Sequence, residues 1–301
     1  MSFKNALKNL VAHFGTVWAL LLYIVVFAAL ITGLSLPFVL PIARAFDDAG
    51  VFSSAREAFS ALFGEGGWQG MLDGLYAMYN AVVDVFVNND RMVSLTTAFL
   101  IFVVIVAVRF FFGLHEIPMA TVLDGQLSSN AHYGFGGKFV STLWMSMRFS
   151  LAKMLFTVVF DAIIGAVIYG IAVGMGFNVA LPFVLIFVAL VFISLRYSLC
   201  ACWTSSIVCD GYGVIKGFAR SVKICFIRFG TIYSSYFVAF IIIMALGMFI
   251  TIFTVGVGLI IVFPLFATFI SYLNITVYYN KTGKRYYIDG AVFTPPYENG
   301  I

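Results

Sequence analysis

Charged side chains are scarce in this chain. Only 10% of its 301 residues are Asp, Glu, Lys or Arg, whereas a soluble domain carries about 25%. Hydrophobic residues make up 62% of the sequence. These values exclude an ordinary soluble domain and indicate a protein that lies in a lipid bilayer.

Residues that could form a catalytic or metal site are also few. The chain has three histidines, and none lies four residues from another potential ligand. Glu116 follows His115, but the second histidine of a zinc-protease helix is absent. No glycine-rich phosphate loop follows a strand. We therefore expect no metal site and no cofactor, and nothing indicates an enzyme.

The four cysteines all lie at or beyond the end of the fourth hydrophobic run, at Cys200, Cys202, Cys209 and Cys225. Their spacing differs from the paired thiols of ordinary zinc sites. In a reducing compartment we expect free thiols that serve as small apolar side chains. Metal binding and palmitoylation are the alternatives.

Six hydrophobic runs reach the roughly 20 residues that cross a hydrocarbon core about 30 Å thick. The first is too long for a cleaved signal peptide, so we expect it to be retained. The runs predict transmembrane helices near Thr16–Leu40, Met92–Leu114, Leu151–Gly174, Ala180–Cys202, Thr231–Thr254 and Gly258–Tyr279. Val255-Gly256-Val257 predicts a tight turn between the last two helices.

The basic residues predict the orientation of these helices. If both termini are cytoplasmic, 14 of the 17 Lys and Arg residues lie on the cytoplasmic side, as the positive-inside rule requires. Only Arg44, Arg56 and Arg91 then lie outside, among seven acidic residues. We expect a multi-pass protein of the cytoplasmic membrane, and the net charge of +4 needs no nucleic-acid partner to explain it.

A short motif recurs three times before a hydrophobic run, as His13-Phe14-Gly15-Thr16, Arg148-Phe149-Ser150-Leu151 and Arg228-Phe229-Gly230-Thr231. A recurrence of this kind indicates an internal repeat. The predicted fold is all-α, a polytopic bundle built from three repeats of an amphipathic helix, here called an elbow helix, followed by a transmembrane hairpin. The repeats span residues 1–125, 134–211 and 214–290 of a single membrane domain, and 291–301 is a cytoplasmic tail.

Each expected elbow helix combines an apolar stripe with basic residues, which is typical of helices that lie in the headgroup layer. In the first, Phe3, Leu7, Leu10, Val11 and Phe14 form a stripe opposite Lys4 and Lys8. The second, Gly137–Phe149, has less charge. The third carries Lys216, Arg220 and Lys223. The basic residues of the first and third are candidate contacts for anionic lipid headgroups.

Each repeat also ends with a hydrophobic pair followed by Asp-Gly, a common turn dipeptide. These pairs place Asp124, Asp210 and Asp289 at corresponding positions. We expect three polar turns, each ending a short helix. Each aspartate has the further option of capping the helix that follows.

The first repeat contains a long outer insertion at residues 43–90. Its apolar residues form two helical stripes, one from Phe52 to Phe63 and one from Trp68 to Phe86. Acidic residues interrupt both stripes, so we expect interfacial helices rather than spans. They are predicted to cap the bundle, and binding of a partner is the alternative.

Asp161 is the one acidic residue inside a predicted span. An intramembrane carboxylate indicates a proton relay, a cation site or an ion pair. Arg109 and Arg196 lie near the cytoplasmic ends of the neighbouring spans, and either can reach Asp161. The structural interpretation, a pair or a neutral aspartate, is favoured over transport chemistry.

Small residues recur every four positions on the third predicted span, at Ala166, Gly170 and Gly174. This pattern favours close packing of another helix. In the sixth span, Pro264 predicts a kink.

One segment resembles a known family. It contains Arg196-Tyr197-Ser198-Leu199, Asp210-Gly211-Tyr212-Gly213, Arg220-Ser221 and Arg228-Phe229. In this order the motifs resemble bacterial membrane proteins of the glycerophosphoryl diester phosphodiesterase membrane-domain type. The resemblance is strongest from Arg196 to Thr231 and implies a six-helix bundle. The metal-binding residues of the phosphodiesterase barrel are absent, so it transfers no activity.

Three functions are compatible with these features. The favoured one is a non-enzymatic membrane scaffold or accessory subunit that engages lipids or a protein partner. The alternative is a small transporter or permease component with Asp161 in a polar path. A membrane-embedded lipid enzyme comes third, because no polar cluster is evident.

Overall fold

The structure, a computed structural model, describes residues 2–64, 67–88, 91–129, 131, 133–176, 180–254, 258–288 and 290–295. The chain divides into two compact units. Unit 1 comprises Met1–Phe27, Arg109–Gly165 and Phe187–Ile301, and unit 2 comprises Ala28–Val108 and Ala166–Ile186.

Six segments are long and apolar enough to cross a membrane, as the sequence predicts. The only sheet in the described ranges is a two-stranded hairpin. Together these features confirm an all-α, multi-pass membrane protein. The six segments are Gly15–Pro37, Thr96–Ser129, Phe135–Met175, Leu181–Asp210, Phe229–Phe253 and Leu259–Thr282.

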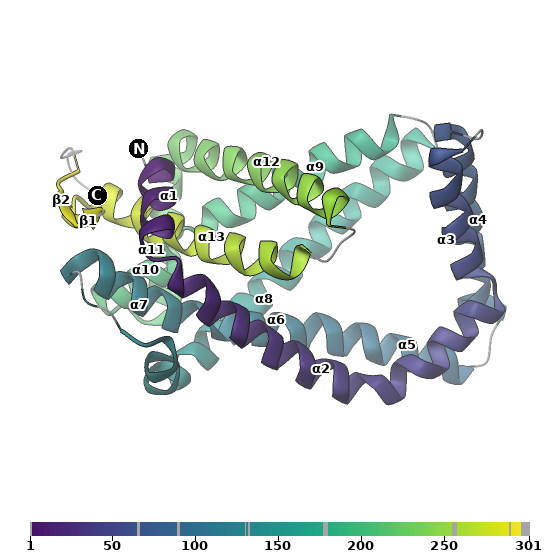
Figure 1. Cartoon of the computed structure of the whole chain (residues 1–301), viewed down its shortest axis with the longest axis horizontal. Coiled ribbons are helices and arrows are strands. Elements are labelled where there is room, and N and C mark those ends of the chain that lie inside the picture. Colours follow the sequence, from purple (N-terminus) through teal and green to yellow (C-terminus); the bar gives the residue numbers. More distant parts are fainter. Residues whose placement is uncertain are drawn as a thin grey trace. The chain divides into compact units, whose positions relative to one another are not determined.

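The membrane segments are built from long helices labelled in Figure 1, namely α2 (Gly15–Asp48), α8 (Phe135–Met175), α9 (Leu181–Cys200), α12 (Phe229–Phe253) and α13 (Leu259–Thr282). The second segment is divided into α5 (Arg91–Val103), a π-helical turn η1 (Val104–Val108), α6 (Arg109–Leu114) and α7 (Glu116–Ser129). The turn predicted at Val255-Gly256-Val257 lies outside the described residues.

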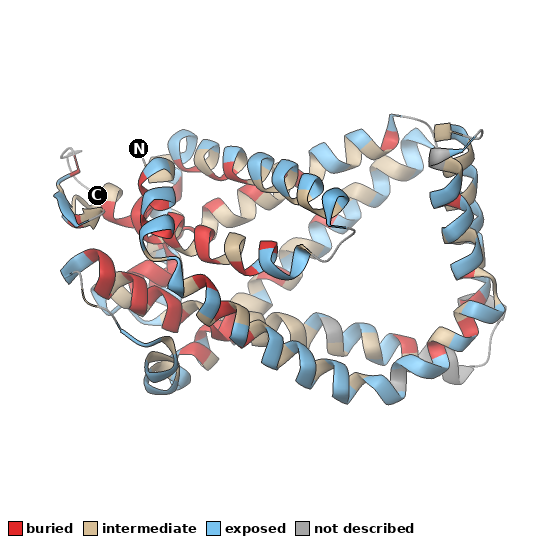
Figure 2. Ribbon diagram, in the orientation of Figure 1, coloured by how far each residue is buried: buried red, intermediate tan, exposed pale blue. Residues whose placement is uncertain are grey.

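The core of unit 1 surrounds α13. Just over half of its most apolar stretch is buried, against less than a fifth for each of the other five membrane segments. It is contacted by the short helices α1 (Ser2–Ala12), α7 and α10 (Trp203–Asp210). Figure 2 shows buried residues concentrated where these helices meet. The region around α13 is therefore a packed protein core, whereas most side chains of the other spans lie on the surface of the protein.

Buried tyrosines are prominent in this core. Tyr236, Tyr272 and Tyr278 are fully buried. The hydroxyl of Tyr272 donates to the Oε1 atom of Gln126 at 2.8 Å, so it joins α13 to α7. In an apolar surrounding, a buried hydroxyl needs such a partner because water is absent.

A β-hairpin follows α13, with strands β1 (Tyr286–Ile288) and β2 (Ala291–Phe293) paired antiparallel. Part of the expected tail is therefore ordered. The Tyr286 side chain is buried, which raises its pKa, and its hydroxyl accepts from Asn5 Nδ2 at 2.7 Å. The C-terminal hairpin is thus held against α1.

The elbow helices are only partly as predicted. Separate helices form at α1 and at α11 (Val214–Ile227), but the second expected elbow, Gly137–Phe149, is continuous with its span in the 41-residue helix α8. The motif explains the difference. The first and third copies carry Gly15 and Gly230, whereas the second carries Ser150, and glycine is the weaker helix former.

The Asp-Gly pairs differ from one another as well. Asp210 ends α10, and Gly211 follows in the left-handed conformation at φ 70°, as predicted. Asp124 instead lies inside α7, so the turn predicted there is wrong. Tertiary contacts hold this part of the helix: Asp124 binds the hydroxyl of Tyr279 and the thiol of Cys209, and a Cβ at Gly125 would lie 2.2 Å from the ring of Tyr133. Asp289 lies outside the described residues.

Unit 2 contains the two helices predicted in the insertion, α3 (Val51–Phe63) and α4 (Gly67–Asn88). They pack closely, since a Cβ at Gly74 would lie 2.6 Å from Ala58 Cα. Trp68 of α4 stacks on Phe183 of α9 with ring centroids 5.9 Å apart. The helix before them is longer than the span predicted there, because α2 continues through two prolines to Asp48.

Within the described residues of unit 2, the small-residue stripe on α8 receives no helix. Ala166, Gly170 and Gly174 are exposed. A Cβ added at either glycine would meet no described atom within 4 Å. The predicted close packing at this face is therefore not made within unit 2.

Candidate functional site

The first polar site of unit 1 lies at Asp161 on α8. Arg109 Nη1, at the start of α6, lies 2.6 Å from Asp161 Oδ2. Arg196 Nη1, on α9, lies 2.5 Å from Asp161 Oδ1. The sequence indicated either arginine as a partner, and the structure brings both together on one carboxylate.

This arrangement neutralises the aspartate and leaves one net positive charge. The three side chains keep 20% to 30% of their surface exposed, so the site is neither deeply buried nor open. Removing one member of such a cluster leaves a charge without a partner in a medium of low polarity, which is costly. The cluster therefore ties α8 to both α6 and α9.

The π-helical turn η1 ends directly before Arg109. A π turn inserts one extra residue and changes the direction of the side chains that follow it. Such turns are rare and often occur near functional sites. Hydrophobic periodicity in Val104–Val108, a run of aliphatic residues and alanine, gave no sign of it.

A second ion pair lies about two helical turns away along α8 and joins this helix to α7. Lys153 Nζ of α8 binds Glu116 Oε1 at the start of α7. Both side chains are about four-fifths buried. The sequence suggested only a metal-site role for Glu116 and no role for Lys153, so this pair was not predicted.

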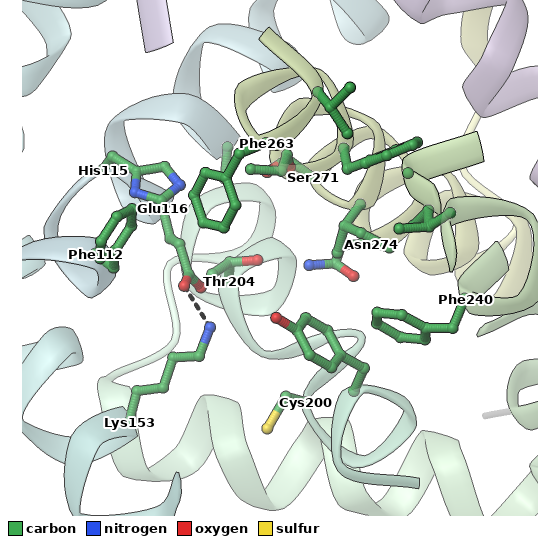
Figure 3. Close-up of a pocket in the computed structure, with 18 of the residues that line it drawn as sticks. Phe112, His115, Glu116, Lys153, Cys200, Thr204, Phe240, Phe263, Ser271 and Asn274 are labelled. Atoms are coloured by element: carbon green, nitrogen blue, oxygen red, sulfur yellow. Dashed lines mark hydrogen bonds and ion pairs between the residues drawn. The ribbon is translucent and has the colours of Figure 1, made fainter. Parts of the chain in front are cut away.

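This second pair lies in the wall of a cavity of about 570 Å³, which Figure 3 shows in close-up. Near the pair are His115, Thr204 and Asn274, which also line the cavity. Asn274 Oδ1 accepts a hydrogen bond from the hydroxyl of Tyr236. His115 is 5% exposed, and its Nδ1 atom has no hydrogen-bond partner.

Most of the rest of the cavity wall is apolar, although Tyr197 and Ser271 also line it. It is formed by side chains of α12 and α13, both membrane segments, together with Phe112 and Phe149. The residues from these two helices include Phe240, Ile243, Leu259, Val262, Phe263 and Phe266. The cavity thus has one polar end and one apolar end. No residue of the Asp161 cluster lines it.

The chemical groups of this site are an ion pair, hydrogen-bonding side chains and one thiol. Within the described residues, no group of three or more His, Cys, Asp and Glu side chains is placed to hold a metal ion. Cys200 lines the cavity as a free thiol, and the other three cysteines are also free, as predicted. Burial raises the pKa of Cys225 on α11 to about 11, so this thiol is protonated at neutral pH.

The predicted turn aspartates are structural links to α13. Asp124 Oδ1 accepts from the hydroxyl of Tyr279 at 2.6 Å and from the thiol of Cys209 at 3.1 Å. Asp210 accepts from the hydroxyl of Tyr278 and pairs with Lys284. Two adjacent tyrosines of α13 therefore each hold the aspartate of one Asp-Gly pair.

The candidate headgroup contacts lie mainly on the surface. Lys4 and Lys8 of α1 and Lys216 and Lys223 of α11 are exposed, while Arg220 is half-buried. The expected stripe of α1 is divided by the fold. Leu10 is buried and Phe3 packs on Phe269, whereas Leu7, Val11 and Phe14 are exposed. The buried face of α1 instead includes the polar side chains of Asn5 and Asn9.

Comparison with protein-family models, with curated proteins and with solved structures finds no match to this chain. The resemblance to the glycerophosphoryl diester phosphodiesterase membrane-domain type therefore stays a prediction. The geometry of the chain itself carries the functional argument.

We expect Asp161→Asn to destabilise the protein, because it leaves Arg109 and Arg196 without their carboxylate. Since the cluster is partly exposed, we expect the free energy of unfolding to fall by about 1 to 3 kcal/mol, which is less than for a fully buried pair. Thermal unfolding of the purified protein in detergent measures the effect. Asp73→Asn, at an exposed aspartate of α4, is the matched control and leaves the midpoint unchanged. Equal midpoints for the two variants would contradict a structural role of the cluster.

Proposed function

We propose that this chain is a membrane scaffold or accessory subunit that engages anionic lipid headgroups through its basic helices. One observation supports the proposal most directly: exposed lysines adjoin exposed apolar side chains on helices at the ends of spans. Such surfaces bind membranes because the apolar side chains enter the acyl region while the ammonium groups meet lipid phosphates.

Helix α1 illustrates the arrangement. Lys4 and Lys8 are exposed, and Leu7 and Val11 are 46% and 68% exposed. In water, these apolar groups would carry a hydrophobic cost. At a bilayer surface the same side chains contact lipid acyl chains and are removed from water.

Helix α11 repeats this combination. Lys216 and Lys223 are exposed beside Ile215 and Phe226, which are 83% and 69% exposed. The opposite face of α11 is buried at Gly217, Ser221 and Ile224. The helix is therefore fixed on the protein by one face while the other remains available to lipid or to a membrane-embedded protein partner.

We place this surface, with both chain termini, on the cytoplasmic side of the cell membrane. The positive-inside rule supports this orientation, because 14 of the 17 basic residues then lie inside. A reporter fused after Asp289 is expected to show cytoplasmic activity, as measured with an enzyme that is active on one side only. External activity would contradict the orientation.

Transport through Asp161 receives less support. Each of its carboxylate oxygens has an arginine partner, and the cavity wall does not include it. A carrier site needs ligand positions that open and close, whereas this carboxylate is occupied on both sides. We therefore favour the structural role for Asp161.

We expect Lys4→Gln/Lys8→Gln and Lys216→Gln/Lys223→Gln each to reduce binding of anionic lipid several-fold. Each lysine near a charged bilayer surface contributes about 1 kcal/mol. The measurement is the enrichment of phosphatidylglycerol over phosphatidylcholine among lipids that copurify with the full-length protein from mixed vesicles.

Arg44→Gln/Arg56→Gln is the matched control for these double variants. Both arginines are exposed, and both belong to unit 2. This variant removes the same charge and leaves the enrichment unchanged. An equal decrease in all three variants would show a general charge effect and would contradict a specific role for α1 and α11.

A further inference from the structure

We propose that the 570 Å³ cavity of unit 1 binds a membrane lipid with an uncharged, hydroxyl-bearing head, of the diacylglycerol class. The volume is within the range of about 300 to 1,000 Å³ that is usual for small-molecule pockets. This inference goes beyond the proposed function, because it concerns the membrane interior rather than the basic surface.

The apolar end of the cavity is accessible from the lipid side of the spans. Leu259 and Phe263 both line the cavity, yet they are 47% and 51% exposed. Both belong to α13, and Phe240 and Ile243 of α12 lie in the opposing wall. An acyl chain can therefore pass from the bilayer into the cavity without entering water.

The polar end offers hydrogen bonds with little net charge. Glu116 and Lys153, the only residues in the wall that carry a full charge, neutralise each other. Because the Oδ1 atom of Asn274 already accepts from Tyr236, its amide group remains as a donor. In Figure 3 the side chains of Glu116, Thr204 and Asn274 converge on the same space.

This balance of charge selects the head of the ligand. An anionic phosphate would lie against the carboxylate of Glu116, and a bare cation would lie against Lys153. Either would break the existing ion pair at a site where desolvation is costly. A hydroxyl group can donate to the carboxylate and accept from the Asn274 amide while the pair remains intact.

The cavity also contains an unsatisfied group that a hydroxyl would serve. His115 is buried and lines the cavity, and its Nδ1 atom has no hydrogen-bond partner. Buried polar atoms in proteins are normally paired, so a ligand hydroxyl in the cavity can serve as a partner of this imidazole.

The test uses the full-length protein in phosphatidylcholine nanodiscs that contain a diacylglycerol with a photoactivatable acyl chain. After illumination, mass spectrometry identifies the labelled peptides. We expect labels on α12 and α13 between Phe240 and Phe266, and competition by unlabelled diacylglycerol. Equal competition by phosphatidylglycerol would contradict the preference for an uncharged head. Labelling at scattered exposed positions would contradict binding in the cavity.

Gly247→Leu fills the cavity with little strain, because Gly247 lines it and a Cβ there meets no described atom within 4 Å. We expect labelling to fall at least tenfold. Gly170→Leu is the matched control: it also lies in a span with no atom within 4 Å of its Cβ, but outside the cavity wall. Unchanged labelling in Gly247→Leu, or an equal fall in both, would overturn the proposal.

Thermal unfolding in detergent shows whether the variants fold. Ala267→Leu fills the same cavity from α13 and replaces Gly247→Leu if that variant does not fold. The lysine variants of α1 and α11 provide a separate comparison. They should retain full diacylglycerol labelling, so failure of the headgroup proposal and failure of the cavity proposal are distinguishable.

Discussion

The charge of Asp161 is the constraint on which the arrangement of unit 1 depends. A carboxylate within a membrane span requires a partner, and here it has one arginine from α6 and one from α9. Two turns along α8, Lys153 pairs with Glu116 at the start of α7. In each partner a basic residue precedes an acidic one in the sequence, Lys153 and Asp161 in α8 and Arg109 and Glu116 in the segment formed by α6 and α7. A shift in register that brought Lys153 to Arg109 would place like charges together. The two pairs therefore specify one alignment, in a bilayer where the hydrophobic effect between helices is weak.

This alignment also creates the cavity. Glu116 and Lys153 can line its polar end because the Asp161 cluster holds α6 and α8 side by side, and Gly113 permits the close approach. A Cβ at Gly113 would lie 3.1 Å from Ser150 Cα and closer to its side chain. The apolar end comes from α12 and α13, whose side chains face both the cavity and the lipid. One part of the structure thus provides fixed polar groups, and another provides access from the bilayer. A binding module requires both.

The sequence predicts much of this architecture, because long hydrophobic runs and amphipathic stripes are local signals. It also predicts that Arg109 and Arg196 can reach Asp161, since all three interrupt apolar runs. It does not predict that α8 is continuous. The three motifs are so similar that all three suggest a separate elbow helix, and the single difference of Ser150 in place of glycine is a weak signal. Nor does it predict that Asp124 lies inside a helix, because the hydroxyl of Tyr279 that binds its carboxylate comes from a distant part of the chain. The cavity is the feature that local sequence patterns predict least, because its wall combines residues that lie far apart in the sequence, from Phe112 to Asn274.

The central claim is that Asp161 holds α6, α8 and α9 together through its two arginine partners and is not part of an aqueous path. Its most direct test keeps the ion pairs intact and places a cysteine on either side of them, in a variant without the four native cysteines. Thr157→Cys and Ile164→Cys are suitable, because both residues are buried on α8, one turn before and one turn after Asp161. Membrane-impermeant thiol reagents are applied from each side of the membrane to the folded protein. We predict that neither cysteine is labelled. Rapid labelling of both would contradict a purely structural role of Asp161 and would establish a water path past it.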